Sequence, residues 1–236
     1  MKEREVLIIE NAEKRADCIK ELIEPFGAKG KIVKPYLGEE MPLPSNTEAV
    51  IISGGPMSIY EANLPQYEYL KREADFIAKM VDKNRAILGI CLGHQLLAHV
   101  LGGKVKPIAD NLLEIGWPKI FLNNNGKNDL LFSKMPHEFQ IFQYHRDETI
   151  DLPRNTINLA CSKLCGIQAF RYSNKPIWGI QFHPEISLEK SKEILQSRKV
   201  EIEKQGLDFS LTVEQGLSVS QKPRKQIFLN FIKILK

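Results

Sequence analysis

The stretch Ala86-Ile87-Leu88-Gly89-Ile90-Cys91-Leu92-Gly93-His94-Gln95-Leu96-Leu97 decides the fold of this chain. Residues 86–90 form an apolar run typical of a buried strand, and a helical pattern begins directly after Cys91 with no loop between them. A strand that passes into a helix at a single residue strains the backbone there, and Gly89 and Gly93 leave room for so tight a turn. The thiol is then held at the amino end of a helix, where the dipole favours the thiolate. The pattern predicts a nucleophile elbow with sulfur as nucleophile.

A second motif supplies a base for this thiol. Residues 176–182 are typical of a buried strand, and His183, Pro184 and Glu185 follow it directly. A Cys–His pair whose imidazole is oriented by a carboxylate is the thiol form of a catalytic triad. A buried cysteine alone is more often inert, so the prediction depends on the combination. Catalytic groups gather at the carboxyl ends of parallel strands, so we expect Cys91, His183 and Glu185 to meet.

The chain as a whole predicts one α/β domain over residues 1–236. Apolar strands alternate with helical patterns, which indicates a mostly parallel central sheet with helices on both faces. The first strands are expected at 6–9, 31–33, 49–52 and 86–90, with helices at 12–26, 64–81 and 92–101. Shorter strands are expected at 117–122, 139–143, 158–162 and 167–171, leading back to the strand at 177–182.

The last fifth of the chain has a different character. Residues 188–204 predict a charged helix, a less regular stretch carries Gly206 and Gly216, and Pro223 begins a final amphipathic helix. The net charge is +4, and the part from Lys190 onward has a balance of +5. We interpret this basic segment as a solvated helical face, with a docking surface for a partner protein as the alternative. Nucleic-acid binding is not expected, because aromatic residues do not interleave with the charges.

Composition limits the remaining possibilities. Hydrophobic residues make up 43% of the chain, which suits a globular fold with a core. The four cysteines lack the paired spacing of a zinc site, so no metal is expected, and so few thiols suggest a reducing compartment. Residues 1–5 are charged and lead into a strand, unlike a signal peptide. No apolar run approaches the ~20 residues that cross a bilayer. We expect a cytoplasmic protein without membrane partners.

Three segments together resemble the class I (triad) glutamine amidotransferases, and within them the GMP-synthase-like glutaminases. These segments are Gly89–Gln95, Gly179–Glu185 and the glycine loop Ser53–Ser58. The resemblance covers roughly residues 5–187 and the final helix, and it implies a flavodoxin-like fold. In relatives a helix with an Asn-Phe pair follows the His-Pro-Glu motif closely. Here Asn230-Phe231 comes late, so residues of about 187–222 are expected to be a helical insertion.

The resemblance also implies a reaction, the hydrolysis of the side-chain amide of glutamine. Attack by Cys91 gives a tetrahedral oxyanion, which needs N–H donors at ~3 Å. The backbone N–H of Leu92 follows the elbow nucleophile and is one expected donor, and that of Gly55 in the glycine loop is the second. His183 protonates the departing ammonia, a γ-glutamyl thioester remains on Cys91, and water then releases glutamate. No cofactor is required.

Other residues are expected to hold the substrate. By resemblance, Gly54 belongs to the oxyanion loop and Gln95 lines the glutamine pocket. His145, Arg146 and Asp147 correspond to a His-Gly-Asp segment that positions the amino-acid end of glutamine, and Arg146 stands where glycine is usual. This adds a cation that could meet the substrate carboxylate or a different group. Segment 114–117, beginning with Glu114, also resembles the GMP-synthase-like subfamily, and we assign it a structural role.

Two further functions stay open beside the glutaminase. Residues 1–236 contain no ATP-binding loop of the form G-x-x-x-x-G-K-[ST], so a glutaminase would pass ammonia to a separate synthase partner. A free-standing γ-glutamyl peptidase or hydrolase could use the same Cys-His-Glu triad, with Arg146 and the insertion tuning its pocket. A non-catalytic binding module is the third possibility, and the intact Cys91, His183 and Glu185 argue against it. The sequence identifies neither the ammonia acceptor nor the oligomeric state.

Overall fold

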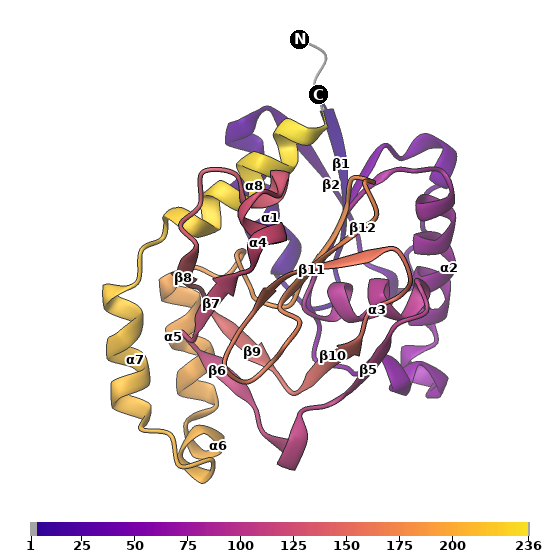
Figure 1. Cartoon of the computed structure of the whole chain (residues 1–236). Coiled ribbons are helices and arrows are strands. Elements are labelled where there is room, and N and C mark those ends of the chain that lie inside the picture. The colour runs from indigo at the N-terminus through magenta and orange to yellow at the C-terminus, as the bar shows by residue number, and fades with distance from the viewer. Residues whose placement is uncertain (1–3, 236) are drawn as a thin grey trace.

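A nine-stranded sheet forms the centre of the computed structural model, which describes residues 4–235 (Figure 1). Residues 1–3 of the expected charged lead-in lie outside the described part of the chain, as does residue 236. The strands run in the order β2-β1-β3-β4-β13-β12-β11-β7-β8. In chain order they are β1 (Arg4–Ile9), β2 (Ala28–Val33), β3 (Ala49–Ile52), β4 (Ala86–Ile90), β7 (Lys119–Leu122), β8 (Glu138–Gln140), β11 (Thr156–Cys161), β12 (Ala169–Tyr172) and β13 (Ile177–Ile180).

The sheet has a parallel half and an antiparallel half. Strands β2, β1, β3, β4 and β13 pair in parallel, whereas β12, β11, β7 and β8 pair antiparallel. Four strands lie in two small antiparallel pairs: β5 (Lys104–Pro107) with β10 (Asp147–Asp151), and β6 (Glu114–Gly116) with β9 (Gln143–His145). The predicted strand at 139–143 is wrong as one element, because its ends pair with different partners as β8 and β9.

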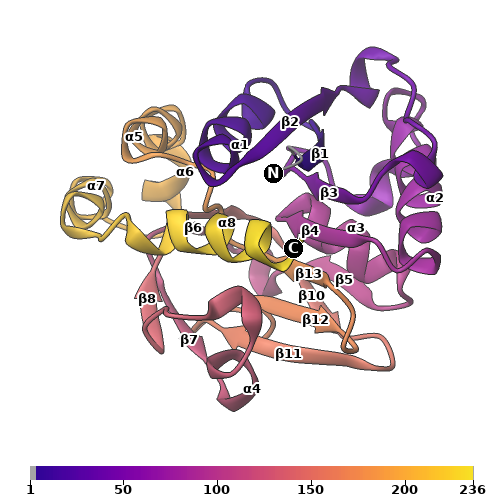
Figure 2. The ribbon, with the colours of Figure 1, turned by 90° about the horizontal axis from the view of Figure 1, so that it is seen from above.

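Alternate side chains of the parallel strands cover two separate cores, as expected for a sheet buried on both faces. On one face Ile8, Ile51 and Leu88 pack against α1 (Arg15–Ile23) and α8 (Lys222–Ile234). On the other face Ile9 and Ile52 pack against α2 (Tyr69–Asp82) and α3 (Leu92–Val100). Figure 2 shows α1 and α8 on one side of the sheet and α2 on the other. The predicted α/β fold is therefore confirmed.

Helices α5 to α7, which follow Glu185, lie beside the sheet rather than over its centre (Figure 2). The expected helix at 188–204 is interrupted at Arg198, giving α5 (Leu188–Ser197) and α6 (Lys199–Lys204). The prediction of a less regular stretch between the two expected helices is wrong, because this stretch contains α7 (Phe209–Ser218). Gly216, which weakened the helical pattern, is needed there since a Cβ would lie 2.5 Å from Trp117 Nε1. No helix in the described part of the chain is long and apolar enough to cross a membrane.

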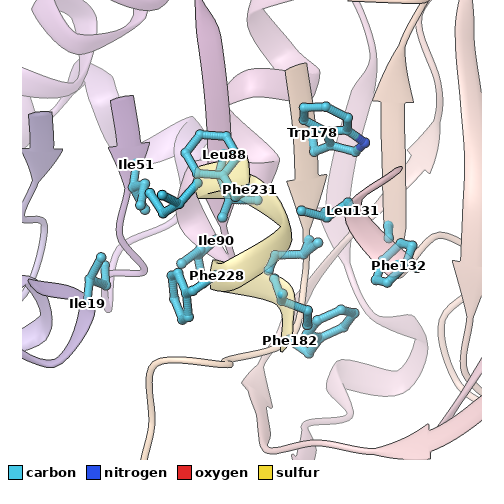
Figure 3. Packing of buried hydrophobic residues seen from close by; sticks show 14 of the residues in the cluster. Ile19, Ile51, Leu88, Ile90, Leu131, Phe132, Trp178, Phe182, Phe228 and Phe231 are labelled. Atoms are coloured by element: carbon cyan, nitrogen blue, oxygen red, sulfur yellow. The ribbon is translucent and has the colours of Figure 1, made fainter. Parts of the chain in front are cut away.

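The final helix α8 is a structural part of the main core. Phe228 and Phe231 are fully buried and point from α8 toward the strand residues Ile51, Leu88 and Ile90 (Figure 3). Phe231 also meets the Trp178 ring edge-on, with 6.5 Å between the ring centroids. Large buried aromatic side chains carry much of the stability of such a core.

We expect truncation of Phe228 to alanine to lower the free energy of unfolding by about 3–5 kcal/mol, because it removes buried surface and leaves a cavity. Chemical denaturation measures this change. Lys225→Ala on an exposed position of α8 is the control and should change stability by less than ~0.5 kcal/mol. A loss below ~1 kcal/mol for Phe228→Ala would contradict the packing of α8 on the sheet.

Candidate active site

Cys91 lies at the junction of β4 and α3 in a strained backbone conformation, with φ 53° and ψ −105°. The turn is possible only because of its two glycines. A Cβ at Gly89 would overlap the Gly93 carbonyl, and a Cβ at Gly93 would lie 2.5 Å from the Ile52 oxygen. The Cys91 N–H donates to the Ile180 carbonyl at 2.8 Å and ties the turn to β13. The strained turn expected from the sequence is present.

Three strand ends bring the predicted catalytic segments together. Gly54 follows β3, Cys91 follows β4 and His183 follows β13, and these strands are neighbours in the parallel half of the sheet. A Cβ on Gly54 would lie 2.8 Å from His183 Cε1 and 3.3 Å from Cys91 Cβ. Any side chain at Gly54 would therefore disturb both residues. The three segments of the sequence motif meet at the carboxyl edge of the sheet, as expected.

His183 and Glu185 form a buried pair. His183 Nδ1 lies 2.7 Å from Glu185 Oε1, and both side chains are at most 3% exposed. Burial alone would lower the pKa of His183, but the negative charges of Glu185 and Cys91 outweigh it and raise this pKa above its ordinary value. Burial alone would raise the pKa of Glu185, but attraction to His183 and Arg15 outweighs it and lowers this pKa. The pair therefore favours an imidazolium beside a carboxylate.

Two arginines outside the predicted motifs hold this pair in place. Arg15 on α1 has its Nη1 atom 3.8 Å from Glu185 Oε1. Arg224 on α8 donates from Nε to the Pro184 carbonyl at 2.9 Å and from Nη2 to the Glu185 carbonyl at 3.2 Å. The final helix thus fixes the backbone of the segment that carries the base.

The thiol of Cys91 has a second neighbour, the backbone of Tyr144. Cys91 Sγ lies 3.9 Å from the Tyr144 carbonyl oxygen, within reach of a weak S–H hydrogen bond. His183 Nε2 is buried and has no hydrogen-bond partner among residues 4–235. Because Nδ1 is engaged by Glu185, Nε2 is the ring atom available for proton transfer with the thiol or a substrate.

A buried polar network supports the glycine loop. Ser53 Oγ accepts a hydrogen bond from the Asn11 N–H at 2.9 Å, and Asn11 Nδ2 donates to Glu73 Oε1 at 3.1 Å. A Cβ on Gly55 would lie 2.8 Å from Leu92 Cδ2, so Gly55 packs directly against Leu92, the first residue of α3. The first N–H groups of a helix have no intrahelical partner. The two residues expected to supply the oxyanion donors, Gly55 and Leu92, are therefore in contact in space.

The segment from Tyr144 to Asp147 is fixed by a second network. His145 donates from Nδ1 to the Asp147 carbonyl and contacts Glu114 Oε2 through Nε2, each at 2.9 Å. Burial raises the pKa of Glu114, but hydrogen bonds from His145 and its other neighbours outweigh this and lower it overall. The other donors to this carboxylate are Ser162 and Gln168, each at 2.6 Å. The structural role expected for segment 114–117 fits this contact.

Glu114, His145 and Cys165 place possible metal ligands within 4.8 Å of one another. The oxygens of Glu114 are already taken by hydrogen bonds from protein donors. Burial raises the pKa of the Cys165 thiol, which favours the protonated form of this sulfur. We interpret the cluster as a hydrogen-bonded support for the Tyr144–Asp147 segment.

The remaining predicted binding residues line one cavity. Gln95 Nε2 donates to the Asp147 carbonyl and to Gln181 Oε1, each at 3.1 Å. The Asp147 carboxylate accepts hydrogen bonds from Ser58 and, at 2.6 Å, from Tyr60. Arg146 forms an ion pair with Glu201 of α6, so its cation is already balanced by a carboxylate.

The cavity has a volume of about 530 Å³, and Cys91 forms part of its wall. His183, Gln95, His145, Arg146 and Asp147 also contribute to this wall, as do Gly55, Arg15 and Ser58. Ile194, Ser197 and Arg198 form another part of the wall, so α5 and its junction with α6 border the same space. The structure thus brings the predicted side chains of Cys91, His183, Gln95, His145, Arg146 and Asp147 to one cavity, while Glu185 is buried behind His183. No local pattern in the sequence indicated Arg15 or Arg198, which reach the cavity by tertiary packing.

Comparison with known proteins defines the family of this fold and site. Residues 7–202 match the class I glutamine amidotransferase family, and the chain belongs to this family. It is 30% identical over 191 residues to a glutamine-hydrolyzing GMP synthase subunit of Methanococcus vannielii, a match that covers 80% of this chain and 92% of the relative. It is 31% identical over 187 residues to the glutamine-hydrolyzing GMP synthase of Borrelia garinii subsp. bavariensis, covering 79% of this chain but 33% of that protein.

A solved structure supports the same assignment. A glutamine amidotransferase from Thermotoga maritima superposes with a TM-score of 0.83 and 29% sequence identity, over 100% of this chain and 99% of the other. The chain is therefore similar, within the class I glutamine amidotransferases, to the glutamine-hydrolyzing subunit type of GMP synthase.

The fully buried Glu73 carboxyl leads to a test of the loop network. Burial raises its pKa to about 7, against the lowering effect of the Asn11 hydrogen bond. The folded protein therefore retains a proton that the unfolded chain loses above pH ~4.5. The resulting stability is complete below that pH and is lost as the pH rises to about 7. Glu73→Gln stays neutral at every pH. Its free energy of unfolding should therefore exceed that of the wild type by about 3 kcal/mol at pH 8 and equal it near pH 4.

Denaturation at pH 4, 6 and 8 measures the dependence of this difference on pH. Asp75→Asn, an exposed carboxylate on the same helix, is the matched control and should show no such trend. A difference between Glu73→Gln and wild type that stays constant from pH 4 to 8 would contradict a buried, protonated Glu73.

Proposed function

We propose that this protein is a glutaminase that hydrolyses the side-chain amide of glutamine through a thioester on Cys91 and supplies ammonia to a synthase partner. One observation carries the proposal most strongly. A strained cysteine at a helix start lies beside a histidine whose Nδ1 is bound by a buried glutamate at 2.7 Å. Membership of the class I glutamine amidotransferases supports hydrolysis of glutamine as the reaction.

The first half-reaction forms the acyl-enzyme. The thiolate of Cys91 attacks the amide carbon of glutamine, and the carbonyl electrons move onto oxygen. The N–H groups of Leu92 and Gly55 stabilise the oxyanion. His183 then gives its Nε2 proton to the nitrogen as the carbon–nitrogen bond breaks. Ammonia leaves and a γ-glutamyl thioester remains on Cys91.

The second half-reaction returns the enzyme to its starting state. His183, now neutral, removes a proton from water through Nε2, and the resulting hydroxide attacks the thioester carbon. A second tetrahedral oxyanion uses the same two donors. Its collapse expels the Cys91 thiolate and releases glutamate. Throughout both steps Glu185 holds the imidazole by Nδ1 and balances its positive charge.

Two observations support a synthase as the partner protein. Residues 1–236 have no phosphate-binding loop for ATP, and the relatives of the chain include a protein named as one subunit of a GMP synthase. We therefore propose that ammonia is passed to a separate ATP-dependent synthase. Residues of about 187–222 are proposed as a helical addition to a single domain. Their helices α5–α7 lie at the side of the sheet, and α5 borders the active-site cavity.

The nucleophile assignment predicts a specific loss of activity. Cys91→Ser should lower the rate of ammonia and glutamate release from glutamine by roughly 10⁴-fold or more, since the residues of a catalytic unit act together. Cys161→Ser, at a free cysteine on β11, is the control and should keep wild-type activity. A glutamine-like electrophile should label wild-type protein at Cys91 alone. Full activity in Cys91→Ser would overturn the mechanism, and cleavage of γ-glutamyl dipeptides in preference to glutamine would make the protein a peptidase.

The Glu185–His183 pair predicts a change in the pH profile. Glu185→Gln should lower kcat by on the order of 10²–10⁴-fold, because the imidazolium loses its orienting charge. Against the lowering effect of burial, Glu185 raises the pKa of His183, so its removal lowers that pKa. The proton needed by the leaving ammonia is then lost at lower pH, and the alkaline limb of the acylation rate should move toward acid. Single-turnover rates from pH 5 to 10 measure this shift. Glu189→Gln, an exposed neighbour, should leave the limb in place.

A further inference from the structure

We propose that Arg198, at the junction of α5 and α6, is the residue that binds the α-carboxylate of the substrate. This inference deepens the proposed function, since it assumes a γ-glutamyl substrate whose amide lies at Cys91. The carboxylate of such a substrate lies at its far end from the amide. A cation on the cavity wall, away from the thiol and free of an internal partner, is the group that would recognise it.

Three arginines border the cavity, and their partners distinguish them. Arg15 has its Nη1 atom 3.8 Å from Glu185, and Arg146 is paired with Glu201. Within the described residues, no carboxylate lies within 4.0 Å of the Arg198 guanidinium, and its side chain makes no hydrogen bond. The guanidinium instead lies over the ring of Tyr144, whose centroid is 5.5 Å from Arg198 Cζ. Arg15 Nη1 also has no hydrogen-bond partner among the described residues, but Glu185 balances the charge of this arginine. Arg198 is therefore the cavity arginine that has neither a carboxylate partner nor a side-chain hydrogen bond.

The contact with Tyr144 relates the position of Arg198 to that of Cys91. The Tyr144 carbonyl is the neighbour of Cys91 Sγ, at 3.9 Å, while the Tyr144 ring carries the Arg198 guanidinium. One residue thus links the reacting sulfur to the cation across the cavity wall. Such a cation–π contact leaves the guanidinium edge free to bind a carboxylate in the planar, bidentate manner typical of arginine.

The charges on the cavity wall also match an amino acid. Asp147 and Glu61 border the cavity as carboxylates, and the Asp147 side chain is held in place by Ser58 and Tyr60. Arg198 supplies the opposite charge. A substrate with an α-ammonium group and an α-carboxylate can meet an anion and a cation in the same cavity. Compounds that lack the α-carboxylate leave Arg198 without its ligand.

Packing and an ion pair hold Arg198 in position. Ile202 and Leu195, on either side of it, are at most 1% exposed and pack in a cluster with Trp117 and Phe142. Glu201, three residues after Arg198, pairs with Arg146 in the segment that also contains Tyr144. The start of α6 is therefore fixed to the cavity wall, and Arg146 acts as a positioning residue rather than as a substrate ligand.

The experiment compares L-glutamine with 4-aminobutanamide, which keeps the amide and the amine but lacks the α-carboxylate. In Arg198→Ala we expect the KM for glutamine to rise roughly tenfold or more with kcat little changed, because a charged hydrogen bond to the substrate is lost. The KM for 4-aminobutanamide should stay within about twofold of wild type. Arg198→Lys should recover part of the loss. Lys192→Ala, an exposed cation on α5 that does not border the cavity, should resemble wild type with both compounds.

Equal losses of kcat/KM with both compounds, or no loss with either, would overturn the assignment of Arg198. A separate readout keeps it testable if glutamine is not turned over. Calorimetric binding of L-glutamine to Cys91→Ala should weaken roughly tenfold on adding Arg198→Ala, whereas unchanged binding, or no binding before the second change, would contradict the proposal. Absent hydrolysis with this binding pattern intact would refute the glutaminase mechanism and leave the carboxylate site standing.

Discussion

The backbone of Cys91, at φ 53° and ψ −105°, is the constraint on which the rest of this structure depends. Such a conformation costs on the order of 1–3 kcal/mol and persists only where the surroundings over-determine it. Here β4 is paired on both sides, with β3 and β13, and the N–H of Cys91 is bound by Ile180. The helix that follows is packed against β3 so closely that only glycine fits at position 93. The parallel sheet thus holds the strained turn that places Cys91 on the cavity wall.

The same arrangement explains why the base is available. Because β13 lies directly beside β4, the residues after the two strands must share one edge of the sheet. Burial would by itself leave His183 neutral, yet Glu185 and the sulfur reverse this preference. The buried negative charge of Glu185 is in turn compensated by His183 and by Arg15. Removing one member leaves a buried charge without a partner, which is strongly destabilising. Each charge of the site therefore depends on the presence of the others.

Much of this could be predicted from the sequence, for a definite physical reason. Strands such as 49–52 and 86–90 are buried on both faces, so their apolar runs are continuous and their ends are sharp. The residues that follow those strands were therefore easy to place at one edge. Strands β5 and β10 were missed because they gain their structure from a partner distant in the sequence rather than from an apolar run. The sequence did not predict helix α7, because glycine lowers helix propensity. Gly216 is needed there because the Trp117 ring leaves no room for a Cβ.

What the sequence could not supply is the outer wall of the cavity. The sequence indicated that the Arg146 cation could meet the substrate carboxylate or a different group, and long-range packing pairs it with Glu201. The two arginines therefore differ in their contacts. Arg146 joins α6 to the Tyr144–Asp147 segment, whereas Arg198 lies over the Tyr144 ring and has no carboxylate partner among the described residues. No local motif encodes such a pairing, because it depends on where α5–α7 pack against the Trp117 cluster. The proposed reacting centre is thus encoded by short motifs at strand ends, whereas the recognition that we propose for the substrate's far end depends on tertiary contacts made by the C-terminal helices.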